Sequence, residues 1–317
     1  MAEFSFADFF SHALHAVVVA AVACAFLPLV SWLEALRGDE TSHAAGRAHS
    51  ASAALATAIK LLEKRAPRVA GSDRIVSRLA PILALVPTLM VLGLMPMQSR
   101  PSDVPLVLCL SLFLLSTTAV ALAGMASANR LVLLAAVRLF SIRVVVISVV
   151  GTAALAIVRD AGSSSLSGIV SAQQGSLWDV LPRWGMFVSP LSFLAALISW
   201  AFYAQQTIRA RTEASLAPTW IAESTGPGLL GHRIFESLDL VAGAALLVCV
   251  FAGGEHAPIA PALAWILKTG LMLVLLVLVR NRLPHLAPAS VVRVLWLVLF
   301  PLAVAGTAWV LISQHAI

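Results

Sequence analysis

The stretch ESTGPGLLGHRIFESLDLVAGAALLVCVFAGG (Glu223–Gly254) joins a polar, glycine-rich start to an apolar run that suits a membrane. Glu223 and Glu236 come before the apolar run, and Asp239 lies at its beginning. Carboxylates at a membrane helix are costly unless they are paired, hydrated or functional. The pattern therefore predicts a membrane helix over about 238–253 with acidic groups at its cytoplasmic mouth.

The composition of the whole chain supports a membrane protein. Of 317 residues, 60% are hydrophobic and 11% charged, and the mean hydropathy is +0.95. Soluble domains contain about 25% charged residues. The net charge of +6 fits loops on the cytoplasmic side of a bilayer, so it does not require a nucleic-acid partner.

Eight runs are long enough to span the bilayer, which takes roughly 20 apolar residues. They cover about 13–33, 79–97, 104–125, 131–157, 184–203, 238–253, 260–279 and 291–313. The sequence thus predicts an all-α integral membrane protein whose single domain, 1–317, has long cytoplasmic loops at 34–78 and 204–237. We interpret the first run as a retained helix, because no basic residue precedes it.

The lysines and arginines predict the orientation. If the N-terminus is outside, most of them fall in one set of loops, and the opposite set holds only Arg100, Arg159 and Arg183. Cytoplasmic loops carry this excess. Both termini are therefore expected outside, and both long loops inside. The helical spacing over 51–66 fits either an interfacial helix or an ordinary helix packed on the bundle.

The sequence contains no pattern typical of a metal site or of an independent enzyme. Cys24, Cys109 and Cys249 stand singly in apolar runs, which is typical of small buried hydrophobes. The eight histidines form no cluster with zinc-ligand spacing. A phosphate-binding loop and a nucleophile elbow are also missing, so we expect no metal ligands and no hydrolase or kinase activity.

Several charges fall inside the predicted helices and are candidates for an ion path. Lys268 lies mid-way along the seventh helix, and Arg143 lies deep in the fourth. Each could instead serve the fold alone, Lys268 by neutralising Asp239 or Glu236. Glu236 and Asp239 share a helix face, although Glu236 could simply complement the helix dipole.

Two further acidic residues lie in the second long loop. Glu223 is a weaker ion-path candidate, since it could pin the loop by pairing with Arg209 or Arg211. Glu213 stands alone among arginines and is weaker still. Arg138 lies near enough to the cytoplasmic end of its helix to snorkel into the interface.

Six stretches in order resemble one protein family. They are AIKLLEKRAPRVAGSDRIVSRLAPILALVP, AGMASANRLVLLAAVR, IVSAQQGSLWDVLP, ESTGPGLLGHRIFE, LAWILKTGLMLVLLVLVRNRLP and VLWLVLFPLAV, spread over about residues 55–313. This series resembles the H-type membrane subunits of bacterial respiratory complex I and the related membrane anchors of energy-converting hydrogenases and formate hydrogenlyase.

The resemblance implies a multi-pass subunit of a bacterial inner membrane with eight helices and no redox centre of its own. Members of the family line a quinone cavity beneath a soluble redox module, and they begin a chain of buried charges that leads to antiporter-like subunits. The chain would then be a non-catalytic membrane subunit of an ion-translocating assembly. The alternatives are a purely structural anchor and a stand-alone secondary transporter.

The sequence departs from the family at positions that carry chemistry. The segment RGDETSHAAGRAHS replaces the family's Arg-Gly-Pro-Asn segment, and Ile147 stands where the family has a membrane glutamate. In the acid-rich loop only Glu213 falls in register, whereas Arg211 and Ser215 occupy carboxylate positions. We therefore expect a degenerate quinone site and no cofactor bound by this chain.

Overall fold

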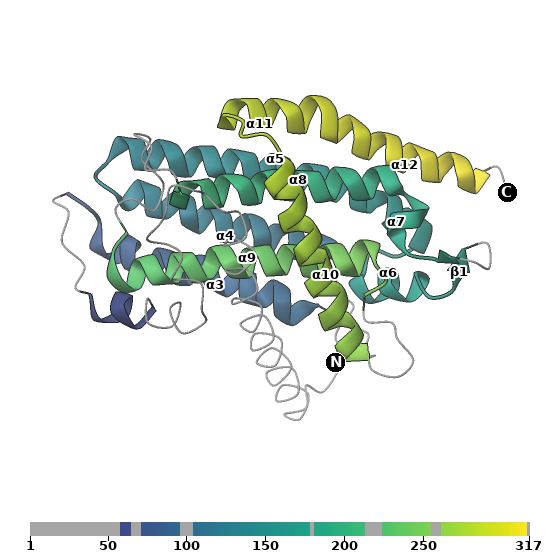
Figure 1. Cartoon of the computed structure of the whole chain (residues 1–317), viewed down its shortest axis with the longest axis horizontal. Coiled ribbons are helices and arrows are strands. Elements are labelled where there is room, and N and C mark those ends of the chain that lie inside the picture. The colour runs from purple at the N-terminus through teal and green to yellow at the C-terminus, as the bar shows by residue number, and fades with distance from the viewer. Residues whose placement is uncertain are drawn as a thin grey trace, which may run out of the picture.

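The computed structural model describes residues 58–64, 71–95, 104–177, 181–212, 224–254 and 261–315. Its elements, labelled as in Figure 1, are α3 (Arg74–Leu94), α4 (Leu106–Ala126), α5 (Arg130–Ala161), α6 (Leu166–Ala172), β1 (Ser176–Leu177), β2 (Leu181–Pro182), α7 (Gly185–Val188), α8 (Pro190–Thr212), α9 (Gly226–Phe251), α10 (Pro261–Arg282), α11 (Pro288–Val294), the π-helical segment η2 (Leu295–Leu299) and α12 (Phe300–His315). The predicted first helix, 13–33, lies outside the described residues, as do Glu213 and Glu223.

The described chain is helical apart from the short antiparallel pair β1–β2. Six stretches are long and apolar enough to cross a membrane: Ile75–Leu94, Leu106–Ala126, Arg130–Ala161, Gly226–Phe251, Leu263–Arg282 and Pro288–Ser313. α8 corresponds to a seventh predicted span, although Gln205 and Gln206 make its second half polar. The predicted class, a multi-pass helical membrane protein, is confirmed.

The predicted boundaries of the second long loop were wrong. α8 continues to Thr212, and α9 begins at Gly226, so only 213–225 separate the two helices. The apolar run alone underestimated α9, because its first turns carry His232, Arg233 and Glu236. Pro227 in the first turn is compatible with this early start, because a proline there sacrifices no helical hydrogen bond.

The first long loop is also more structured than its predicted boundaries. α3 begins at Arg74, where the Asp73 side chain accepts hydrogen bonds from the backbone of Ile75 and Val76. Residues 58–63 are helical, in agreement with part of the helix predicted over 51–66. Ile59 and Leu62, placed on one face by the sequence pattern, are both exposed in this helix.

α9 is the centre of the bundle. Along its apolar stretch 89% of the residues are buried, against 28% for the stretch that spans α11, η2 and α12 at the edge. α9 packs against α3, α8 and α10 and also contacts α5, α6 and α7 (Figure 1). A helix that is apolar on all sides belongs inside a bundle. The polar side chains of α9 are therefore enclosed by protein.

Candidate functional site

A buried ion pair joins α5 to α9. Arg143 Nη2 donates to Asp239 Oδ1 at 2.7 Å, and the two side chains are 0% and 4% exposed. The bond is single, because Arg143 Nε and Nη1 have no hydrogen-bond partner among the described residues. An arginine and a carboxylate often form two parallel bonds instead. This pair is therefore held in a geometry that leaves the guanidinium partly unsatisfied.

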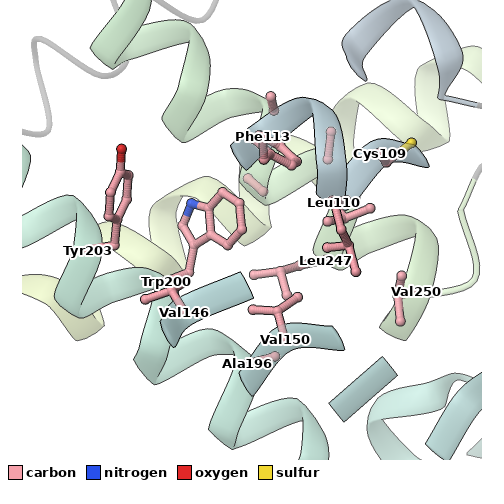
Figure 2. Close-up of a cluster of buried hydrophobic side chains, with 14 of the residues drawn as sticks. Cys109, Leu110, Phe113, Val146, Val150, Ala196, Trp200, Tyr203, Leu247 and Val250 are labelled. Atoms are coloured by element: carbon pink, nitrogen blue, oxygen red, sulfur yellow. The ribbon is translucent and has the colours of Figure 1, made fainter. Parts of the chain in front are cut away.

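Three aromatic rings surround the Arg143 guanidinium. Its central carbon lies 4.8 Å from the ring centroid of Phe113 on α4, and 4.5 and 4.2 Å from those of Trp200 and Tyr203 on α8. Figure 2 shows Trp200 between Phe113 and Tyr203. Ring faces attract a desolvated cation by about 2 kcal/mol each. We call these three residues the aromatic cage; it replaces part of the hydration that Arg143 loses.

Glu236 does not lie at the mouth of a helix, as the sequence suggested. It is the eleventh residue of α9, about 15 Å from the helix start at 1.5 Å per residue, and it is 6% exposed. The helix dipole acts within the first turn, so it does not account for this carboxylate. Glu236 precedes Asp239 by one turn, and its charge and that of the Arg143–Asp239 pair act on the phenol of Tyr203.

Lys268 lies at the opposite end of α9 from these charges. Its Nζ donates to the carbonyl oxygens of Ala252 at 3.0 Å and Gly254 at 3.1 Å, and it lies 4.7 Å from the Trp184 ring centroid. Ala252 follows Asp239 by thirteen residues, or about 20 Å along the helix. The expectation that Lys268 approaches or neutralises Asp239 is therefore wrong, since Arg143 fills that role.

Sequence reasoning missed Gln173, whose amide lies beside Lys268's carbonyl partners. Gln173 Nε2 donates to the carbonyls of Ile169, Cys249 and Val250 at 3.3, 3.1 and 2.9 Å. Its Oε1 accepts from the backbone of Gly185 and Gly253 at 3.0 and 2.9 Å. A lone glutamine in a loop carries no pattern that would reveal such a role.

A cavity of about 540 Å³ lies where α9 begins. Its walls come from the 58–64 helix, α3, the end of α4 and the start of α9. The charged side chains among its described lining are Glu63, Lys64 and Arg78, and His232 also borders it. Glu213 and Glu223 cannot be placed relative to it. Arg138 is exposed on α5, as the snorkelling interpretation requires.

The described cysteines agree with the sequence prediction. Cys109 and Cys249 are buried among apolar side chains at 0% exposure, and Cys24 lies outside the described residues. Within the described ranges, no three His, Cys, Asp or Glu side chains come together as metal ligands would. Ile147, one turn after Arg143 on α5, is partly buried and packs against the hydrophobic core.

The comparison with known proteins places this chain in a family. Residues 42–311 match the NADH dehydrogenase family. The second of the H-type subunits of NADH-quinone oxidoreductase in Cereibacter sphaeroides is 30% identical over 271 residues, covering 83% of this chain and 84% of the relative. The first such H-type protein of Rhodopseudomonas palustris is 29% identical over 270 residues, with 83% of each chain covered. The chain therefore belongs to the NADH dehydrogenase family of H-type subunits, which are multi-pass membrane components of the complex-I-like class.

Proposed function

We propose that this chain is the component of an ion-translocating membrane assembly that links a soluble redox module to antiporter-like subunits. Family membership supports an assembly of several subunits. The excess of basic residues in one set of loops supports a bacterial inner membrane with both termini outside. No reacting group is assigned to this chain, so its contribution is to hold and conduct charge.

The observation that carries the proposal is the Arg143–Asp239 pair. A carboxylate and a guanidinium fully enclosed between helices are costly, and charges inside membrane proteins commonly mark ion or proton paths. Arginine keeps its proton in proteins. Asp239 is therefore the member that takes up and releases a proton, and Glu236, one turn away, is the next acidic group toward the start of α9.

We further propose that the cavity at the start of α9 is not a working quinone site. Ile147, Arg211 and Ser215 stand at positions where the resemblance implies carboxylates. Among the described lining residues, Glu63 is the acidic one. A photoreactive quinone should leave the cavity residues unlabelled in the purified assembly, and a quinone-site inhibitor should not change ion movement; labelling of His232 or Arg78 would refute this part.

A purely structural anchor is the second candidate, and the enclosure of the pair favours it. Arg143 is 0% exposed, and aromatic rings cover it. An anchor would need the pair for folding only. The two candidates differ in ion movement, because an anchor with an intact fold tolerates loss of the titrating carboxylate.

The test begins with extraction in mild detergent through a tag on this chain. Several large hydrophobic partners should copurify; a stable isolated monomer would contradict the proposal. The purified assembly is then placed in liposomes, and proton uptake is followed under a sodium gradient or during NADH oxidation. Asp239→Asn should abolish uptake per assembled complex, whereas Asp160→Asn, which alters a partly exposed pair with Arg183, should leave uptake unchanged.

A further inference from the structure

The position of the Arg143 guanidinium depends on a glycine in α9. Gly243 is buried, and a Cβ atom built at this position overlaps the Trp200 side chain at Cε2, Nε1 and Cζ2. The indole thus lies directly on the backbone of α9. Trp200 is 0% exposed and fills the space between this backbone and Arg143.

The indole has no polar reason to lie there. Its Nε1 has no hydrogen-bond partner among the described residues. Phe113 packs edge-on against Trp200 with ring centroids 4.9 Å apart. Shape therefore fixes Trp200: the missing methyl group of Gly243 on one side and the ring of Phe113 on another.

This packing explains the single bond between Arg143 and Asp239. A guanidinium that could turn freely would offer two N–H groups to a carboxylate, which is the stronger arrangement. Here rings occupy three sides of the guanidinium at 4.2–4.8 Å, and only Nη2 reaches Oδ1. The cage compensates the charge of Arg143 without tightening its bond to Asp239.

We propose that Gly243 and Trp200 are positioning residues that keep the Arg143–Asp239 pair singly bonded, and therefore separable, during ion movement. This proposal rests on the proposed function of the pair. When a proton binds Asp239, an O–H bond forms on the carboxyl group and the Nη2–Oδ1 hydrogen bond is released. Arg143 keeps all its protons and is held by the rings until Asp239 gives the proton up.

The experiment uses the assembled complex in the liposome assay. Gly243→Ala pushes the indole toward Arg143, so proton uptake per assembled complex should fall at least fivefold. Trp200→Phe alone leaves a gap beside Arg143 and should lower uptake about threefold. In the double variant Gly243→Ala/Trp200→Phe the new methyl group occupies part of that gap, so uptake should recover to within twofold of the wild type.

Gly228→Ala is the matched control, because it lies on the same helix and its added Cβ meets nothing within 4 Å. Its uptake should equal the wild-type value. If Gly243→Ala does not assemble, the double variant must restore assembly, and the reduced uptake of Trp200→Phe decides the functional part. Wild-type uptake in assembled Gly243→Ala or in Trp200→Phe would overturn this proposal alone, whereas wild-type uptake in Asp239→Asn would overturn the proposed function.

Discussion

The two halves of α9 hold two cations in different ways. Arg143 lies deep in the bundle and is compensated by one carboxylate and three rings. Lys268, near the end of α9, binds two backbone carbonyls that the helix itself leaves without partners. One cation balances a group that can change its charge, and the other completes a helix terminus. Depth and charge alone therefore do not identify an ion path; the partner does.

Removing the carboxylate from the first half should have the largest effect. In Asp239→Asn the Arg143 charge stays buried without its counter-charge, which costs about 3–5 kcal/mol for a buried pair. The amount of this chain in the purified complex should fall severalfold, and thermal unfolding should begin at lower temperature. A complex of unchanged content and stability would show that the rings alone suffice for Arg143.

The amide of Gln173 should rank second, because it serves five backbone groups at the end of α9. Each buried group that loses its partner costs about 1–3 kcal/mol, and relaxation of the loop recovers part of this. Gln173→Ala should therefore lower thermal stability clearly without changing proton uptake per assembled complex. Gln174→Ala, at the neighbouring exposed position, is the control.

Lys268→Met should have a smaller effect and gives the sharpest contrast between the halves. Two hydrogen bonds from a charged donor contribute about 1.5–3 kcal/mol each, less here because Lys268 is only partly buried. We expect a modest loss of stability and unchanged proton uptake in the assembled complex. Abolished uptake with normal assembly would place Lys268 on the ion path after all.

Cysteine labelling should perturb the molecule least and tests the orientation. In a chain without native cysteines, Gln174→Cys should react with an impermeant reagent from outside, and Ala128→Cys only from the cytoplasmic side. Both positions are exposed, and they lie beyond opposite ends of α5. The reverse pattern would invert the predicted topology and place the start of α9 outside.

The sequence predicted the features that depend on hydrophobic length. The spans from 79–97 onward, the burial of Cys109 and Cys249 and the family resemblance all follow from runs of apolar residues or from motif order. The start of α9 was missed, because charged first turns enclosed by protein look like a loop when only hydropathy is read. The partner of Asp239 could not be predicted either, since Arg143 is 96 residues away in the sequence.

The aromatic cage shows the same limitation. Phe113, Trp200 and Tyr203 lie in two apolar helices, where aromatic residues usually serve packing alone. Only the angle between α4, α5 and α8 turns their faces toward one guanidinium. Lys268 was placed correctly in depth, but its carbonyl partners arise from the turn after α9, where Gly253 adopts a positive φ of 70°.

The most direct test of the central claim, that the Arg143–Asp239 pair conducts charge, replaces both members together. The double variant Arg143→Met/Asp239→Asn leaves no unpaired charge, so its fold should survive, as buried ion pairs replaced by neutral residues often allow. Its assembled complex is compared with wild type for proton uptake into liposomes under the same sodium gradient. We expect normal assembly with uptake reduced at least tenfold; wild-type uptake in that assembled double variant would contradict the account and leave the pair a structural element.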